Sequence, residues 1–346
     1  MSEETELKLR LPVEQAQTSN RLNRRDALRP VKAVRVAFDS SLSPRDAAHR
    51  IVDSCLAHLQ ANEAGVIASD DPEFVHQMRV AIRRLRSALR VFRGIIGKDF
   101  LDDVTPGLRW LGRMLGEARD WDVFHGETLP PLVTAYGDKA VARHISDAVK
   151  QHRDRARTAM REALASGRYA RVIFGVWRWI AEVDTAPPVA EPPVTLMDFA
   201  SRAVRRRHKR VLDQARRLGS LSELERHGLR LATKQLRYAV EFFSPLFPAA
   251  SVMHYLRQLE KIQSTLGAAN DAANALRMIA AVETPTAFAA FSRGWFLGRA
   301  ENHLERSCAV FARLRRAPQL WDDKPFRGLA AGCGSGSVAT RSRKSS

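Results

Sequence analysis

Residues 71–92 read DPEFVHQMRVAIRRLRSALRVF, and this stretch decides the fold. Asp71 precedes Pro72, a pair that predicts a helix N-cap followed by proline at the first helical position. Apolar side chains then recur every three or four residues, at Met78, Ile82, Leu85, Leu89 and Phe92. Such a period is typical of a helix that packs one face against a core. The stretch therefore predicts an amphipathic helix from Asp71 to about Gly94.

A second face of the same helix is basic and lies about 100° round from the apolar face. The first basic stripe consists of His76, Arg79, Arg83, Arg86 and Arg90, with no acidic residue between its ends. Solvated helix faces usually mix signs, because opposite charges four residues apart stabilise a helix and like charges repel. The stripe therefore favours an anionic ligand or an acidic helix opposite it. Arginine suits phosphate in particular, because its planar guanidinium binds two phosphate oxygens at once.

The same features recur 151 residues further along the chain. Residues 222–243 read SELERHGLRLATKQLRYAVEFF and open with a capping box, Ser222 and Glu225. The second basic stripe consists of His227, Arg230, Lys234 and Arg237, beside the apolar residues Leu229, Leu236, Val240 and Phe243. Two LGxxxD elements, at 115–120 and 266–271, keep the same offset. The constant offset indicates a tandem repeat of one helical bundle.

The LGxxxD elements and their neighbours supply further candidates. We expect Gly116 and Gly267 to permit close helix approach, and Asp120 and Asp271 to pair with an arginine or end a helix. Three basic residues on these segments are expected to extend a basic wall: Arg113, Arg119 and Lys261. Arg206 belongs to the run RRRHK at 205–209, which surrounds its helix and is therefore expected to be partly solvated.

The two histidines lie at the fifth position of their helices, where the positive N-terminus disfavours an imidazolium. His76 and His227 are each interpreted as a neutral donor to a phosphate oxygen or as a switch that charges in acid. A buried histidine that holds a neighbouring carbonyl is the structural alternative.

The composition of the whole chain is also basic. Of its 346 residues, 56 are Lys or Arg, 46 of them Arg, against 38 Asp and Glu, which gives a formal net charge of +18. This excess favours an anionic partner such as nucleic acid, a membrane surface or a polyphosphorylated molecule. An arginine-rich genome is the other source of such a bias.

Helical patterning divides the chain into two halves. We expect helical bundles at 41–183 and 196–327, joined by a Pro-rich linker at 184–195. Residues 1–40 predict an extended leader and 328–346 a disordered tail. The cysteines, Cys55, Cys308 and Cys333, are widely spaced, which is typical of a reducing cytosol and argues against a structural zinc site. No run approaches about 18 apolar residues, so no membrane span is expected.

The motifs HQMRVAIRRLR from His76 and HGLRLATKQLRY from His227, with the LGxxxD elements, resemble those of the CHAD family, the conserved histidine α-helical domain. The resemblance covers about residues 41–316. It implies an all-α fold of two pseudo-symmetric four-helix bundles flanking a basic groove. It also implies inorganic polyphosphate as the ligand and, for some members, a location on polyphosphate or polyhydroxyalkanoate granules. The residues that it places in the groove are His76, Arg79, Arg83, Arg86, His227, Arg230, Lys234 and Arg237.

Residues 4–8, ETELK, resemble the strand that opens the CYTH triphosphate tunnel domain. Fewer than forty residues precede the helical region, too few for such a closed barrel. We therefore interpret the segment as a vestige of that domain or a chance match, and expect no triphosphatase activity.

The sequence thus predicts a cytoplasmic, non-catalytic polyphosphate-binding protein, with no metal or cofactor. It contains no Gly-rich phosphate loop and no HExxH motif. The alternative is a sequence-nonspecific nucleic-acid-binding protein, for which Tyr238 is the one candidate stacking platform. A polyphosphate-cleaving enzyme would need a metal site, and the basic face offers no acidic cluster for one. The candidate binding residues are His76, Arg79, Arg83, Arg86, Arg90, Arg113, Arg119, Arg206, His227, Arg230, Lys234, Arg237 and Lys261.

Overall fold

The computed structural model describes residues 28–185, 194–316 and 320–321, and the regular structure of these residues is entirely helical. The predicted all-α class is therefore confirmed. None of the helices described is both long and apolar enough to cross a membrane. The CYTH-like segment, most of the Pro-rich linker, the tail from 328 and Cys333 lie outside these residues.

The helices of the first half run from residue 44 to residue 185 and include one π-helical turn. They are α2 (Pro44–Ala68), α3 (Pro72–Val91), α4 (Lys98–Val123), the π-helical turn Phe124–Thr128, α5 (Leu129–Tyr136), α6 (Lys139–Leu164) and α7 (Gly167–Thr185). The second half contains α8 (Leu196–Ala215), α9 (Glu223–Phe242), α10 (Ala249–Ala280) and α11 (Thr286–Arg316). Short 3-10 turns follow α8 at Leu218–Ser220 and α9 at Ser244–Leu246.

The predicted helix starts are confirmed. The carboxylate of Asp71 accepts from the backbone N–H of Glu73 at 2.8 Å. Ser222 and Glu225 form both hydrogen bonds of the capping box at the start of α9. Each cap satisfies backbone donors that have no partner within the helix. The first helix ends at Val91, a few residues before Gly94.

The helix boundaries keep the 151-residue offset at three places. The starts of α3 and α9, their ends, and the starts of α4 and α10 all differ by this number. The positions equivalent to α7 would fall at 318–336, most of which lie outside the described residues. The four-helix count of each bundle and the domain boundaries therefore stay predictions.

The two halves share a continuous core where the ends of α3 and α9 meet. Phe92 stacks on Phe199 of α8 at 5.3 Å between ring centroids and meets Phe243 edge-on at 5.6 Å. Phe92 and Phe243 are fully buried. Burying such aromatic side chains supplies much of the free energy that holds an interface together.

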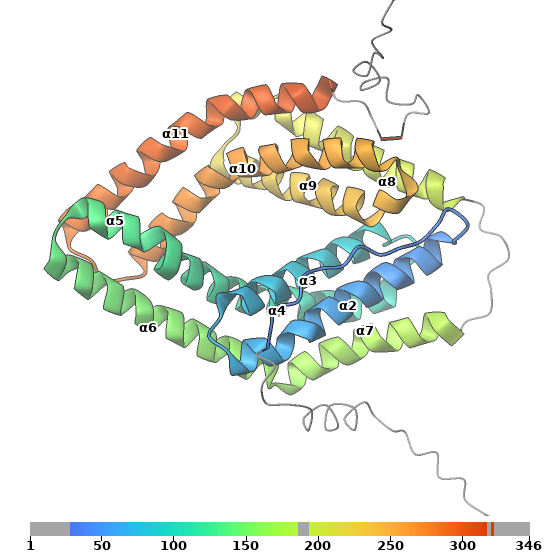
Figure 1. The fold of residues 1–346 in the computed structure, drawn as a ribbon, viewed down its shortest axis with the longest axis horizontal. Helices are drawn as coiled ribbons and strands as arrows, with labels where there is room; N and C mark the ends of the chain where they lie inside the picture. The colour runs from blue at the N-terminus through green and yellow to red at the C-terminus, as the bar shows by residue number, and fades with distance from the viewer. Residues whose placement is uncertain (1–27, 186–193, 317–319, 322–346) are drawn as a thin grey trace, which may run out of the picture.

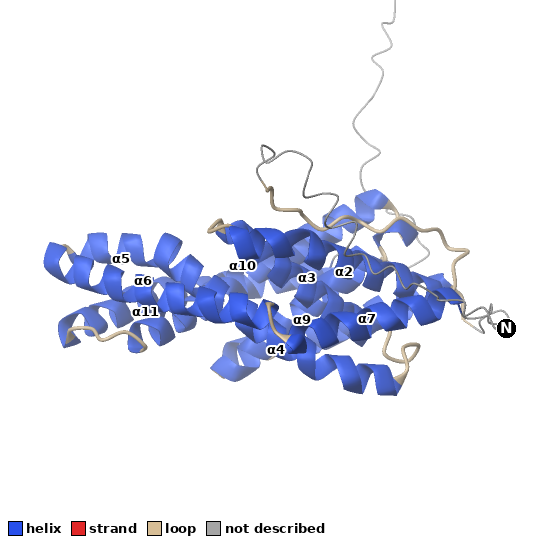
Figure 2. Cartoon of the chain, turned by 90° about the horizontal axis from the view of Figure 1, so that it is seen from below, coloured by secondary structure: helices blue, strands red, loops and turns tan. Residues whose placement is uncertain are grey.

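A second apolar cluster joins the halves at the opposite end of the molecule. Tyr136, at the end of α5, meets Phe288 of α11 at 5.1 Å between ring centroids. With contacts at both ends, the helices form an elongated ring in Figure 1, with α3 and α9 on either side of its middle. Figure 2 shows α5, α6 and α11 together as a slender extension at one end.

The described part of the leader packs Val36 and Phe38 against the core and is hydrogen-bonded to α2 at Val31. Val31 donates its N–H to Asn62 Oδ1 at 3.0 Å, and its carbonyl accepts from Asn62 Nδ2 at 3.0 Å. His58, on the same face of α2, lies 3.0 Å from that carbonyl and 3.2 Å from the amide oxygen of Gln77 on α3. These buried bonds fix the leader beside the N-terminal half of α3.

Candidate anion-binding site

Two arginine–aspartate pairs stand at equivalent positions of the two halves. Arg79 of α3 approaches Asp120 of α4 at 3.6 Å, and Arg230 of α9 approaches Asp271 of α10 at 3.8 Å. Asp120 also approaches Arg277 of α10 at 3.6 Å. The expectation that these aspartates pair with arginines is therefore confirmed.

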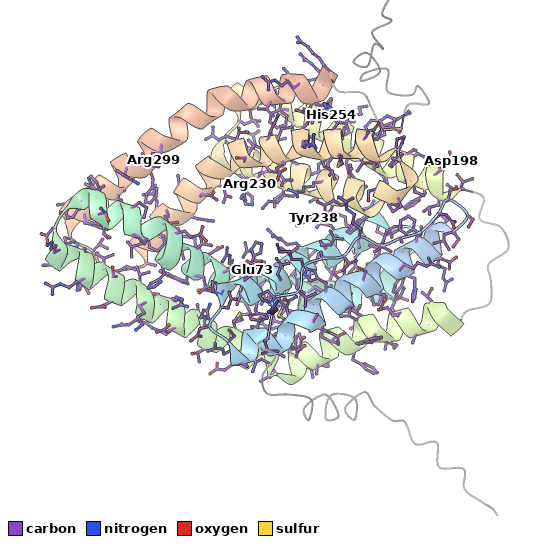
Figure 3. All side chains as sticks on the ribbon, viewed as in Figure 1. Glu73, Asp198, Arg230, Tyr238, His254 and Arg299 are labelled. Carbon is purple, nitrogen blue, oxygen red and sulfur yellow. The ribbon has the colours of Figure 1, made fainter. Side chains whose placement is uncertain are left out.

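The arginines of these two pairs belong to a group of cations that we call the central cluster. Its members are Arg79, Arg83, Arg230 and Lys234. Burial, followed by repulsion from Arg230, Arg83 and Arg79, lowers the pKa of Lys234 to about 7. Burial also lowers the pKa of Arg79, which Arg83, Arg119 and Arg230 repel. Figure 3 shows Arg230 on the side of α9 that faces the inside of the ring. Cations from both sequence repeats thus share one site.

The central cluster has unused hydrogen-bond donors. The Nε atoms of Arg83 and Arg230 are buried and have no partner among the described residues. Buried guanidinium N–H groups normally have a partner, so each unpaired one needs an explanation. An anion bound between the arginines would provide it.

His76 and His227 have different surroundings. Burial, then Arg119, Arg83 and Arg79, lower the pKa of His76, so its imidazole is neutral at neutral pH. His227 is exposed, with Nδ1 3.1 Å from Asn270 Oδ1. The buried structural interpretation is therefore wrong for His227, whereas for His76 the neutral state fits a hydrogen-bond donor at the edge of the central cluster.

The glycines of the LGxxxD elements do not act as expected. A Cβ on Gly116 would lie 2.5 Å from Arg79 Nη1, so this glycine makes room for a guanidinium and not for a second helix. Among the described residues, a Cβ on Gly267 would meet only Asp271 Oδ2, at an ordinary 3.7 Å. The close-approach hypothesis is wrong for both positions, because within the described part of the chain only side-chain atoms lie within 4 Å of these Cβ positions.

The other predicted residues lie outside the central cluster, and of these Arg119 is close enough to repel Arg79. Arg86, Arg90 and Arg113 form a separate basic group with Arg109, and burial followed by their mutual repulsion lowers the pKa of Arg86. Arg206 is exposed on α8, and Lys261 is exposed on α10. Arg119 pairs loosely with Glu127 at 3.7 Å.

Arg237 forms an ion pair with a carboxylate, a feature that the sequence reasoning missed. Its Nε donates to Glu241 Oε1 at 2.8 Å, and its Nη1 donates to Gln263 Oε1 at 3.2 Å. Glu241 also accepts from the buried Arg84 of α3 at 3.0 Å. The spacing of four residues between Arg237 and Glu241 was the signal that pointed to this pair.

Tyr238 is occupied as well. Its ring is half-buried and stacks on Phe242, with 6.5 Å between centroids and 23° between planes. One face of this ring is therefore already covered.

The fold and the site define an all-helical class of protein, with cations from two equivalent helices gathered in one cluster. The chain belongs to the CHAD domain family, whose model matches residues 50–280. The crystal structure of the CHAD domain from the plant Ricinus communis is 33% identical in sequence and superposes with a TM-score of 0.71. The match covers 85% of this chain and 100% of the Ricinus chain. PptA from Streptomyces chartreusis shares the fold, with 16% sequence identity and a TM-score of 0.58. That match covers 79% of this chain and 99% of PptA.

Two relatives are uncharacterized proteins from strains of Mycobacterium tuberculosis. Each is 30% identical over 200 residues, which is 56% of this chain but 39% of the relative. The chain thus matches about two-fifths of the length of these relatives.

Proposed function

We propose that this protein binds inorganic polyphosphate at the central cluster and does not turn it over. Some CHAD family members bind polyphosphate, and the family is generally non-catalytic. The observation that carries the proposal is Lys234, a half-buried amine whose pKa is lowered to about 7 by burial and then by repulsion from the three arginines that share its site. A phosphate chain would relieve this repulsion and accept hydrogen bonds from the unpartnered Nε atoms of Arg83 and Arg230.

The arrangement suits a linear polyanion better than a single phosphate. Successive cations of the first basic stripe are separated by three or four residues, which places about one charge per helical turn of ~5.4 Å. A chain of phosphates can meet several of these charges at once, and each contact releases bound counterions. Binding is therefore expected to be tight at low salt and to weaken steeply as salt rises.

The alternative ligand is nucleic acid, which carries the same kind of charge. Proteins that bind single strands add aromatic platforms on which bases stack. The one candidate, Tyr238, already stacks on Phe242. This favours a ligand without bases.

Competition at physiological salt distinguishes the two ligands. Labelled long-chain polyphosphate is bound to the full chain and displaced by unlabelled polyphosphate, single-stranded DNA or duplex DNA. We expect polyphosphate to compete better per charge than either DNA. Equal competition per charge would contradict the proposal.

The absence of turnover has its own assay. The protein is incubated with Mg²⁺ and tripolyphosphate, and orthophosphate release is followed against a protein-free control. We expect no release above the control, and appreciable release would overturn the non-catalytic part of the proposal. We also propose a cytoplasmic location. Association with polyphosphate or polyhydroxyalkanoate granules, which the family resemblance implies for some members, is a separate proposal.

A further inference from the structure

The two repeats differ in charge where each basic stripe leaves the central cluster. Arg90 and Arg109 of the first half correspond, 151 residues on, to Glu241 and Glu260 of the second. Arg93 and Arg113 correspond to Ser244 and Ser264. The shared helical framework therefore presents arginines on one side of the central cluster and carboxylates and hydroxyls on the other.

In the first half these arginines converge. Arg86 lies across α4, with its Nη1 3.3 Å from the Cβ position of Gly112, in the helical turn that runs from Arg109 to Arg113. The neighbours that repel Arg86 are Arg90, Arg109 and Arg113. Arg90 is repelled in turn by Arg109 and by Arg210 of α8.

The basic surface continues onto α8. Burial, then Arg206, Arg90 and Arg93, lower the pKa of Arg207 to about 10, so α8 lies close to the end of α3. We call this surface the outer track; its residues are Arg86, Arg90, Arg109, Arg113, Arg206, Arg207 and Arg210. Within the described part of the chain, none of these side chains lies within 4.0 Å of a carboxylate.

The equivalent surface of the second half carries two carboxylates, Glu241 and Glu260. Glu241 holds Arg237 at 2.8 Å and Arg84 at 3.0 Å, so its carboxylate occupies the position that Arg90 fills in the first half. Glu260 is exposed on α10. A phosphate chain that left the central cluster in this direction would meet two carboxylates.

Helix-end electrostatics explain only part of the outer track. Arg90 lies in the last turn of α3, where the helix dipole favours a cation. Arg109 and Arg207, in contrast, lie in the middle of α4 and α8. Their approach to Arg90 is a tertiary feature that costs free energy unless an anion is present.

We propose that a bound phosphate chain leaves the central cluster in one direction only, over α3 and α4 of the first half and onto α8. The inference rests on the proposed function and adds a direction and a preference for chain length. Arg79 and Arg90 are separated along α3 by roughly 16 Å, at 1.5 Å per residue. Tripolyphosphate is too short to span that distance, whereas a long chain meets both the central cluster and the outer track.

The test removes two outer-track charges and compares ligands of different length. The outer-track variant combines Arg90→Gln with Arg109→Gln. Its control combines Arg143→Gln with Arg155→Gln, which removes the same number of charges at two exposed arginines of α6. Affinities for long-chain polyphosphate and tripolyphosphate are measured over a salt series, with circular dichroism as a check of folding. We expect the outer-track variant to lose roughly tenfold in long-chain affinity and to show a shallower salt dependence. Tripolyphosphate affinity should change little in either variant.

The outcomes separate the two proposals. If the unmodified protein binds no polyphosphate, the proposed function fails and the outer track fails with it. If it binds long chains, and both variants bind them equally well, only the outer track is wrong. An equal loss for tripolyphosphate and long chains in the outer-track variant would also overturn the directional path, because both ligands would then use the same residues.

Discussion

Phe92 and Phe243 occupy equivalent positions in the two repeats and pack against each other, with their ring centroids 5.6 Å apart. The two halves therefore join where α3 and α9 end. Arg79 and Arg230 also occupy equivalent positions and repel each other. They precede Phe92 and Phe243 by 13 residues, so this charged contact lies about 20 Å along the helices from the apolar one, at 1.5 Å per residue.

Removing one of these rings should weaken the whole molecule. Phe92→Ala leaves a cavity against Phe199 and Phe243, and such truncations typically cost about 3–5 kcal/mol of unfolding free energy. Urea denaturation followed by circular dichroism should show one transition, shifted to lower urea. Phe174→Ala, at an exposed position of α7, should leave the midpoint nearly unchanged. Two separate transitions, with only one of them shifted, would contradict a shared core.

The features that the sequence predicted correctly are local ones. The caps at Asp71 and Ser222 and the faces of α3 and α9 depend on residues within a few positions of each other. These signals act through hydrogen bonds and side chains of the same helix, so no tertiary information is needed.

The features that the sequence did not predict join residues far apart in the chain. Asp122 accepts two hydrogen bonds from the buried Arg157, 35 residues away, at 2.8 and 3.0 Å. Arg84 reaches Glu241 across 157 residues. No local pattern marks such partners, because helix packing determines which side chains meet. The convergence of Arg79, Arg230 and Lys234 was expected from the family resemblance, whereas their spacing alone placed them only on two separate helices.

Reversing one central cation from each half should abolish binding. Arg83→Glu combined with Lys234→Glu replaces two cations by carboxylates beside Asp120 and Asp271, so a phosphate chain would meet net negative charge. Long-chain polyphosphate binding should fall below detection at physiological salt, with helicity unchanged by circular dichroism. Lys139→Glu with Lys150→Glu, two exposed lysines of α6, makes the same change in net charge and should retain binding. Unchanged affinity in the central variant would place the site elsewhere.

Lys234 should make binding depend on pH near neutrality. Because burial and three arginines lower its pKa to about 7, the free protein loses this positive charge as pH rises through 7. A bound polyanion favours the ammonium, so affinity should decrease as the pH rises through this range. Titration calorimetry of Lys234→Arg, which stays charged, should show a flatter profile. His76 does not produce the same step, because its pKa is lowered from 6.5. A profile identical in the two proteins would exclude Lys234 as its source.

The same shift has a consequence for stability. The pKa of Lys234 is about 7 in the folded protein, whereas a lysine without such surroundings, as in the unfolded chain, has a pKa of 10.5. Between these two pH values the unfolded chain therefore binds more protons than the folded one. The unfolding free energy should therefore increase as the pH rises from about 7 towards 10.5. Below pH 7 the charged Lys234 destabilises the folded protein by its full amount. Lys234→Met removes the buried charge and should stabilise the free protein at pH 6 to 7, by an amount that decreases by up to ~1.4 kcal/mol per pH unit at higher pH. Urea unfolding at several pH values measures this difference.

Gly116 should influence binding more than stability. A Cβ in Gly116→Ala would collide with Arg79 Nη1, the far end of a flexible side chain that can move aside. Alanine is favoured over glycine inside a helix by about 1 kcal/mol, so the variant should be no less stable than the parent. The displaced guanidinium would leave its position beside Asp120, and polyphosphate affinity should fall several-fold, about the value of one charged contact.

Gly267→Ala is the matched control, since a Cβ there meets only Asp271 Oδ2 at 3.7 Å. It carries the same helix-propensity gain and leaves the guanidinium of Arg230 in place. Affinity measured by calorimetry should therefore separate the two alanines, while thermal unfolding should not. Equal affinities would show that the position of Arg79 over Gly116 contributes nothing to ligand binding, because only Gly116→Ala displaces an arginine.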